Sequence, residues 1–72
     1  MLSLIMKVFA ERLWKLRLEQ KLMPKELAYK LGVSDSTVCR WERNVMSITD
    51  ENIVKVAKFF DVSSDYLLGL ED

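Results

Sequence analysis

Apolar residues recur in the same short pattern at four places along the chain. At each place one apolar residue stands just before an expected helix cap, and a second follows five positions later. The four pairs are Leu22 and Leu27, Val33 and Val38, Ile48 and Ile53, and Val62 and Leu67. This spacing is typical of a hydrophobic staple, in which the residue before the cap packs on the fourth residue of the helix. The pattern predicts helices that begin near residues 24, 35, 50 and 64.

The residues between the members of these pairs support the predicted helix starts. Ser34, Thr49 and Ser63 can each accept a hydrogen bond from a free N–H group of the first turn. At the remaining start the cap position holds Met23, a poor cap, but Pro24 follows at the first helical position, where proline is favoured. Acidic residues also favour the positive end of the helix dipole in these first turns. They are Asp35, Asp50, Glu51 and Asp65.

Helical spacing of apolar residues marks two further features. Phe9, Leu13 and Leu16 stand at i, i+4 and i+7 and predict an additional helix before the other four. One face of the helix expected from residue 50 is also apolar, through Ile53, Val56, Ala57 and Phe60. No alternation typical of a strand continues beyond the first few residues. The sequence therefore predicts an all-α fold, a single domain over residues 1–72 with five helices around one core.

The composition limits the chemistry that the chain can perform. It has no histidine, which removes Ser-His and Cys-His nucleophile pairs and histidine-containing zinc sites. Its single cysteine, Cys39, can form neither an internal disulfide nor a thiolate zinc site, and this fits a reducing compartment. The acid pair Asp50 and Glu51 fits the first turn of a helix better than catalysis. We therefore expect no enzymatic activity, no cofactor and no metal.

Residues 1–8 form an unusually apolar N-terminal extension. The segment is too short to span a membrane. It also lacks the basic leader and the small-residue cleavage site of a signal peptide. The sequence therefore predicts a cytoplasmic protein without a membrane partner.

Charge is distributed unevenly although the formal net charge is zero. Residues 1–43 hold nine basic and five acidic residues, a balance of +4. Residues 44–72 hold two basic and six acidic residues, a balance of −4. The positive half contains the segment whose pattern is the most informative about function.

Residues 24–43 read PKELAYKLGVSDSTVCRWER and predict two short helices joined by a tight turn. The turn falls at residues 32–34, where Gly32 can leave the first helix through a left-handed conformation. Ala28 is small enough to let the second helix approach the first closely. This arrangement is a helix-turn-helix.

The second helix of this unit has two different sides. Val38 and Trp41 give it an apolar underside at i and i+3. The other side is small and polar at its start and basic further on, with Asp35, Ser36, Cys39, Arg40 and Arg43. A helix that enters a major groove needs such a side, because small polar groups meet the base edges and cations meet phosphate.

The chain resembles the small phage-repressor type of helix-turn-helix protein, the Cro/C1 or XRE family. The resemblance covers most of the chain, and its motifs occur in the expected order and spacing. The matching segments are residues 12–17 (RLWKLR), 26–28 (ELA), 31–34 (LGVS), 40–42 (RWE), 56–62 (VAKFFDV) and 65–69 (DYLLG). The resemblance implies a lambda-repressor-like fold of five helices, with the third as the recognition helix and double-stranded DNA as the partner.

The resemblance also implies roles for particular residues. The residues at base-contacting positions are Asp35, Ser36, Thr37, Cys39 and Arg40. The residues at backbone-contacting positions are Lys25, Ser34, Trp41, Arg43 and Asn44. Arg17 and Glu42 match a family ion pair that ties the first helix to the end of the recognition helix. The residues that match the family's homodimer contact are Met46, Ile48, Ser64 and Leu67.

Several of these residues have a second interpretation from their own chemistry. Arg40 can bind guanine O6 and N7 in a bidentate way, or it can be a solvated surface arginine. Asp35 can accept from cytosine N4, or it can only balance the helix dipole. Ser36 and Thr37 can donate to base or phosphate, or they can cap the helix. Cys39 can be a redox or alkylation switch on the DNA face, or a small incidental residue.

Trp41 is expected in the core, with its N–H near phosphate. That placement is favoured over a stacking platform for single strands.

Departures from the family pattern favour a rival hypothesis. Met23 and Pro24 stand where the family has residues that bond phosphate, and Val45 and Met46 stand where it is often basic. Weaker non-specific DNA binding and a shallower salt dependence should follow. Together with the zero net charge, these residues are compatible with a protein-interaction module of the same fold, such as an antirepressor or an antitoxin-like protein. Asn44 can still adopt the left-handed conformation expected after the recognition helix.

Apolar residues exceed what this core requires. One interpretation is a larger core with a lengthened first helix. The other is an oligomer or partner surface formed by Trp14, Leu18 and the N-terminal segment, with a paired strand as one form for the segment.

Overall fold

The computed structural model describes residues 4–71, and the regular structure within this range is entirely helical. The helices are α1 (Leu4–Glu19), α2 (Pro24–Leu31), α3 (Asp35–Glu42), α4 (Asp50–Phe60) and α5 (Ser64–Leu68). The all-α fold with five helices is confirmed, as are the four starts predicted near residues 24, 35, 50 and 64. None of the helices in the described range is long and apolar enough to cross a membrane.

Hydroxyl caps begin three of the helices as predicted. The Oγ of Ser34 accepts from Thr37 N–H at 3.2 Å. Thr49 and Ser63 cap α4 and α5 in the same way, each accepting from the backbone N–H three residues on. These bonds satisfy N–H groups that the helix itself leaves without a partner.

The start of α2 is stabilised by a different hydrogen bond, which the backbone of the cap residue donates to a side chain. The side chain of Met23 makes no capping hydrogen bond, as expected for a poor cap. Instead, a carboxylate oxygen of Glu26 accepts from the Met23 N–H at 2.8 Å. This is one half of a capping box, and it compensates for the missing hydroxyl.

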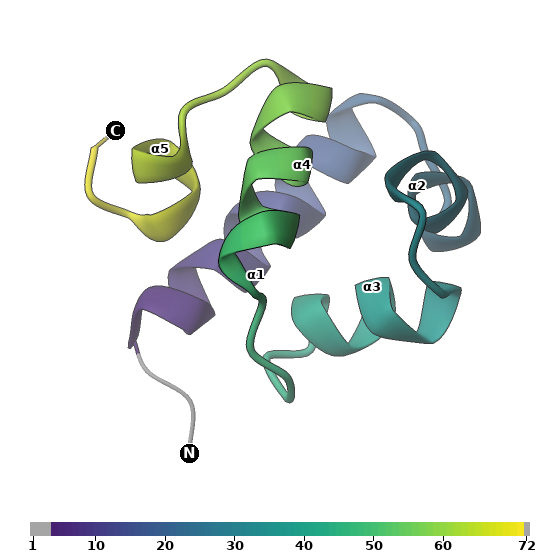
Figure 1. Ribbon diagram of the computed structural model, residues 1–72, viewed down its shortest axis with the longest axis horizontal. Coiled ribbons are helices and arrows are strands. Elements are labelled where there is room, and N and C mark those ends of the chain that lie inside the picture. Colours follow the sequence, from purple (N-terminus) through teal and green to yellow (C-terminus); the bar gives the residue numbers. More distant parts are fainter. Residues whose placement is uncertain (1–3, 72) are drawn as a thin grey trace.

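The helices enclose one core (Figure 1), in which α1 lies behind α4, α2 and α3 lie to one side and α5 to the other. The largest fully buried side chains come from all five helices: Trp41, Phe9, Leu13, Leu27, Leu67, Val38 and Val56. The rings of Phe9 and Trp41 pack edge to face, with centroids 6.3 Å apart. The core thus fixes α3 against α1 through its apolar underside.

The beginning of α1 differs from one of the expectations for the N-terminal segment. Residues 4–8 of the apolar extension are the first turns of α1, so a paired strand is wrong for them and a lengthened first helix is confirmed. The helical choice is physically reasonable because Phe9 and Leu13 already anchor the same helix in the core. Residues 1–3 of that extension lie outside the described residues.

Gly69, just after α5, lies close to Val8 of α1, and its replacement by alanine is expected to destabilise the fold. Its φ is +79°, and a Cβ there would lie 2.8 Å from Cγ1 and 3.2 Å from Cβ of Val8. The left-handed conformation costs alanine about 1–2 kcal/mol, and overpacking adds about 1–3 kcal/mol. We expect Gly69→Ala to lower the free energy of unfolding by about 2–5 kcal/mol in urea denaturation.

Gly32 provides the matched control for this prediction. Its φ is +74°, but nothing lies within 4 Å of an added Cβ. Gly32→Ala should therefore show only the conformational cost of about 1–2 kcal/mol. Equal losses in the two variants would contradict the steric contact between Gly69 and Val8.

Candidate nucleic-acid interface

The helix-turn-helix is built from α2, the turn at residues 32–34 and α3. Leu27, Ala28 and Val38 are buried where the two helices meet. Gly32 leaves α2 in the left-handed conformation that the sequence predicted, and its N–H lies 3.3 Å from the Tyr29 carbonyl. The small side chain of Ala28 is 2% exposed and belongs to the core that α2 and α3 share.

The exposed side of α3 carries the residues predicted to contact bases. Asp35, Ser36 and Arg40 are exposed, and Thr37 and Cys39 are half-buried. Because Val38 and Trp41 are turned into the core, Ser36 and Arg40 lie on the opposite side of the helix, where a DNA groove can reach them. The structure thus places these residues together on one accessible helix, and their contacts with bases stay a prediction.

Three hydroxyl groups gather at the N-terminus of α3. The Oγ of Ser34 lies 2.8 Å from Oγ1 of Thr37 and 3.1 Å from Oγ of Ser36. The hydroxyl that caps α3 is that of Ser34, and the hydroxyl groups of Ser36 and Thr37 lie beside it, so contacts of these two residues with base or phosphate stay a prediction. Each hydroxyl can still make a further hydrogen bond, because it has one donor and two acceptor sites.

The residues predicted to contact the DNA backbone fall into two groups. Lys25, Ser34 and Arg43 are exposed at the ends of α2 and α3, so their polar groups face solvent. Asn44 is half-buried, with the expected left-handed φ of 58°. Among the described residues its Oδ1 is shielded from solvent and has no hydrogen-bond partner.

Trp41 is a core residue, which confirms its predicted place in the fold. Only 2% of its surface is exposed. The side chain packs on Phe9, and the contact of its N–H with phosphate stays a prediction. Trp41 holds α3 in place.

The ion pair that the family resemblance implied is present between α1 and the end of α3. Nε of Arg17 donates to Oε2 of Glu42 at 2.7 Å, and Nη2 donates to Oε1 at 2.9 Å. Nη1 donates to the Leu22 carbonyl at 2.8 Å. The hydrogen bond that Arg17 donates to Glu42 raises the pKa of Arg17 above its ordinary value, against the opposing effect of burial. The pair is bidentate and fixes the orientation of α3 relative to α1.

Two of the four residues predicted at the dimer contact cannot provide one. Leu67 has 0% of its surface exposed, so its assignment to an interface is wrong. Its side chain is buried in the chain's own core. Ile48 is 8% exposed and is likewise a core residue. Met46 and Ser64 are half-buried and keep surface for a partner. The staple pattern in the sequence, which contains Ile48 and Leu67, already indicated burial for both.

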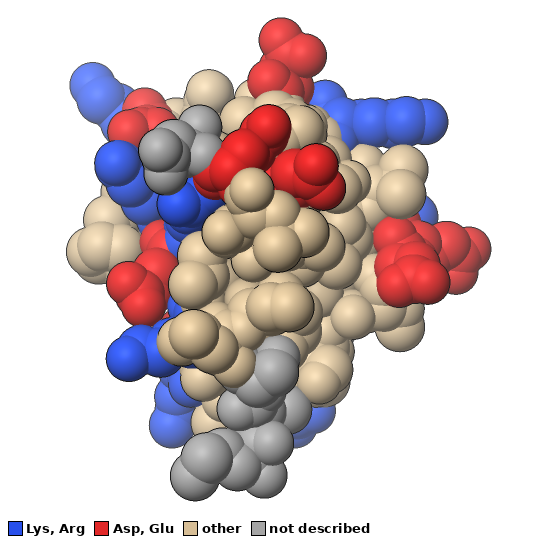
Figure 2. All heavy atoms as spheres, turned by 90° about the vertical axis from the view of Figure 1, so that its left-hand side faces the viewer, with Lys and Arg blue, Asp and Glu red and all other residues tan. Residues whose placement is uncertain are grey.

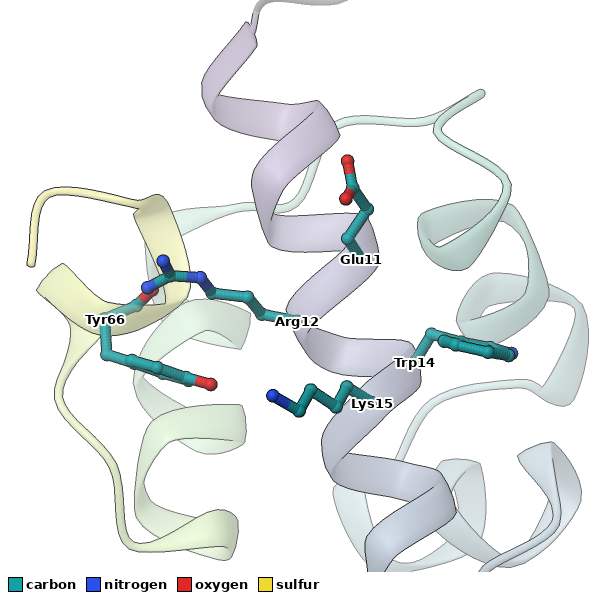
Figure 3. A pocket seen from close by; sticks show the side chains of 5 residues that line it. All are labelled: Glu11, Arg12, Trp14, Lys15 and Tyr66. Carbon is teal, nitrogen blue, oxygen red and sulfur yellow. The ribbon is translucent and has the colours of Figure 1, made fainter. Parts of the chain in front are cut away.

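Arg12 has a structural role that the sequence interpretation missed. Its Nη1 donates to the backbone carbonyls of Tyr66 and Glu71, the latter at 2.7 Å, and its guanidinium lies 4.4 Å from the Tyr66 ring centroid. Figure 3 shows this side chain reaching from α1 to α5, whereas Trp14 points away on the other side of α1. The arginine thus satisfies carbonyl groups at the end of α5 that the short helix cannot.

An open hollow of about 500 Å³ lies beside this contact, lined by Glu11, Arg12, Trp14, Lys15 and Tyr66 (Figure 3). None of the residues predicted to contact DNA lines it.

Within residues 4–71 no group of three or more acidic or cysteine side chains could hold a metal ion.

Comparison with known proteins places this architecture in a family. The sequence profile of helix-turn-helix proteins (HTH_3) matches residues 15–67. The chain is 35% identical over 65 residues to the uncharacterized HTH-type transcriptional regulator YobD of Bacillus subtilis, covering 90% of this chain and 58% of that protein. It is 29% identical over 62 residues to the regulator ImmR of the same organism, covering 86% and 49%.

The chain also matches a third relative. The chain is 34% identical over 64 residues to the HTH-type transcriptional activator BcrR of Enterococcus faecalis, covering 89% of this chain and 31% of that protein. It thus spans between 31% and 58% of the length of these relatives.

The fold is similar to that of the P22 c2 repressor protein, solved in complex with a synthetic operator. The two share 30% identity and a TM-score of 0.82 over 88% of this chain and 96% of that one. Because the profile matches residues 15–67, well over half of the chain, the chain belongs to the XRE-type helix-turn-helix family, and it has the fold of the P22 c2 repressor.

Proposed function

We propose that this chain binds double-stranded DNA sequence-specifically and regulates transcription in the cytoplasm, acting by binding and not by catalysis. The observation that carries the proposal is the polar and basic exposed side of α3, which Trp41 and the Arg17–Glu42 ion pair hold rigidly against α1. The likeness to a repressor solved with its operator supports it. Helix α3 would lie in the major groove, with its N-terminal residues toward the bases.

Each exposed side chain on this face has a definite chemical task in the proposal. Arg40 would bind guanine O6 and N7, the contact for which the guanidinium has matching geometry. Ser36 would bond a base edge, and Asp35 would accept from cytosine N4. Arg43 and Lys25 would neutralise phosphate at the two ends of the helix-turn-helix, which positions the protein without selecting a sequence.

The proposed assembly is a homodimer on a pseudo-palindromic site. Two recognition helices about 34 Å apart would meet two half-sites roughly ten base pairs apart. Repression would follow from occupying a promoter. The relatives include a named activator and a named repressor, so the position of the site relative to the promoter decides the direction of regulation.

A second candidate function is supported by apolar side chains that this proposal does not use. Val45, Trp14 and Leu18 are 61%, 51% and 46% exposed. Val45 lies in the loop after α3, where a basic residue would contact phosphate. A protein-interaction module of the same fold, with a protein as its tightest partner, would use such surfaces.

Selection from a random duplex pool distinguishes the two functions. The purified chain is incubated with random-sequence double-stranded DNA at moderate salt, and the bound DNA is recovered and sequenced. We expect an enriched inverted repeat with half-sites about ten base pairs apart. Absence of enrichment, with no binding even at low salt, would refute DNA binding and favour a protein partner.

A further inference from the structure

The side of α1 that faces away from the core carries a regular row of exposed side chains. Phe9, Leu13 and Arg17 turn the opposite side of the helix into the protein. Spacings of three and four residues keep the row on one face of the helix. The row consists of Leu4, Lys7, Glu11, Trp14 and Leu18, all of which are exposed. We call these five residues the α1 row.

The α1 row is separate from the end of the molecule at which α5 lies. In Figure 3, Arg12 and Lys15 reach from α1 toward Tyr66, whereas Glu11 and Trp14 do not. Because α1 lies behind α4 in Figure 1, its outer side forms the left edge of Figure 2, which is turned by 90°. Basic and acidic side chains both occur along that edge. The row thus belongs to a surface of mixed charge.

The first four residues of the row are self-complementary. Read from either end, an apolar residue comes first and last, and two opposite charges lie between them. The spacings of three, four and three residues are also the same in both directions. If a second copy of the row runs antiparallel, Lys7 lies opposite Glu11 of the second copy, and Leu4 lies opposite its Trp14. A parallel alignment would instead put like charges side by side, which is destabilising.

We infer that the α1 row is a surface through which two copies of this chain associate, with their α1 helices antiparallel about a two-fold axis. A two-fold contact requires a surface that complements itself, and the row does so in both hydrophobicity and charge. Lys7 and Glu11 are available for it, because neither belongs to an ion pair within residues 4–71. Leu4 and Trp14, which are 73% and 51% exposed, would be covered.

The inferred contact differs from the homodimer contact that the family resemblance implies. That contact lies around the loop before α4 and around α5, where Met46 and Ser64 keep surface for a partner. The α1 row belongs to neither element. An additional two-fold contact on α1 would allow copies that are bound to one duplex to associate further. The contact itself does not depend on DNA, whereas this use of it rests on the proposed function.

The two-fold axis that pairs the rows would leave both recognition helices at the same end of the pair. Such an axis is perpendicular to α1 and to the direction in which the row faces. In Figure 1, α1 runs from the lower left to the upper right behind α4, and α3 lies to its lower right. With the row turned to the back, the axis runs in the plane of the picture toward α3. Rotation about it keeps both α3 helices at that end, so the pair can present both to one duplex.

The size of the row predicts weak association. From Leu4 to Leu18 the helix rises about 21 Å, and a helix with side chains is about 10 Å wide, so the strip covers on the order of 200 Å² in projection. A standard stable interface buries roughly 800 Å² per partner. We therefore expect association only at high protein concentration, or on DNA, where bound neighbours have a high effective concentration.

Charge reversal tests the pairing. Lys7→Glu places two carboxylates opposite each other in both pairs, and Glu11→Lys places two ammonium groups there. The double variant Lys7→Glu/Glu11→Lys restores unlike pairs. An equimolar mixture of the two single variants restores them too, because every pair between unlike copies then joins opposite charges. Lys30→Glu, on the exposed side of α2, makes the same charge change outside the row and serves as the control.

Sedimentation equilibrium at increasing protein concentration measures association, and circular dichroism checks that every variant is folded. We expect each single variant to associate roughly tenfold more weakly than the wild-type chain. The double variant, the mixture and Lys30→Glu should associate as the wild-type chain does. Association should also shift the emission of Trp14 to shorter wavelength, because its ring becomes covered, whereas Trp41 is already buried and adds a constant signal.

A wild-type chain that stays monomeric at the highest concentration would overturn the inference, and so would single variants that associate as strongly as the wild-type chain. Failure of the mixture to regain association would exclude the antiparallel pairing. Equal weakening by Lys30→Glu would also overturn it, because net charge and not the row would then be responsible. These measurements contain no DNA. Association through the row, with no DNA selected by the wild-type chain, would therefore refute the proposed function and leave the contact standing.

Discussion

Replacing Glu42 with alanine is expected to lower the free energy of unfolding by about 3–5 kcal/mol. The carboxylate receives two charge-assisted hydrogen bonds from Arg17, at 2.7 and 2.9 Å, and the two side chains are only 10% and 9% exposed. Removing it leaves a guanidinium that is shielded from water and has no counter-ion. A 72-residue domain has a total stability of about 4–11 kcal/mol, so this variant should be near the limit of folding. Urea denaturation followed by circular dichroism measures the loss.

The control removes both charges together. Arg17→Met/Glu42→Leu replaces the pair with apolar side chains of similar length, and such replacements are often neutral or stabilising. The double variant should therefore be clearly more stable than Glu42→Ala. A loss below about 1 kcal/mol in Glu42→Ala would show that the pair behaves like an exposed salt bridge. Because the pair connects α1 to the end of α3, the measurement also reports how firmly the recognition helix is held.

The starts of the helices were predictable because each depends on residues that are close in sequence. The staple pairs and the caps Ser34, Thr49 and Ser63 act within five positions, so the pattern alone identified the starts of α3, α4 and α5. The turn at Gly32 was predictable for the same reason, since a left-handed residue favours glycine. The ends of α1 and α4 are less evident, because Lys21 and Asp61 adopt positive φ values of 58° and 56° without being glycine.

The role of Arg12 was not predictable from sequence spacing. It contacts carbonyl groups 54 and 59 positions further along the chain, so the contact exists only after α1 and α5 have packed together. The conformation of the residues before Phe9 was left open between a longer first helix and a paired strand for a related reason. The first turn of α1 holds no acidic residue that would mark a helix start, and the helix continues there because its later turns are anchored by Phe9 and Leu13.

The candidate site was predictable in its chemistry but only partly in its surfaces. The resemblance assigned Ser36 and Arg40 to one side of a helix, and both are exposed there. It also assigned Leu67 to an interface, although the residue is fully buried. A family position transfers to a new chain only where the side chain remains at the surface, and surface exposure depends on packing between elements far apart in sequence. The apolar residue that is exposed at this end of the chain is Leu70, just beyond the segment 65–69 that matches the family.

Replacing Arg40 with alanine is expected to abolish discrimination at one base pair in each half-site. The side chain is exposed on α3, on the side opposite the buried Val38 and Trp41, so its removal should leave the fold intact. A bidentate arginine–guanine contact contributes about 1–3 kcal/mol of discrimination. A homodimer makes the contact twice, so the preference for the selected site should fall by about 2–6 kcal/mol, roughly 30-fold to more than 10,000-fold. Competition between the selected duplex and one altered at that base pair in both half-sites measures the loss.

Arg43 is the matched control, because it is an exposed arginine one turn further along the same side of the chain. If Arg43 contacts phosphate, Arg43→Ala should weaken binding to all sequences alike and keep the preference for the selected site. Because each copy then neutralises one phosphate fewer, the slope of log K against log salt should become shallower by about 1.8. Arg40→Ala should instead leave the salt slope nearly unchanged and flatten the preference at one position. Undiminished discrimination in Arg40→Ala would exclude this arginine as a base-reading residue, whereas a uniform loss with a shallower slope would assign it to phosphate.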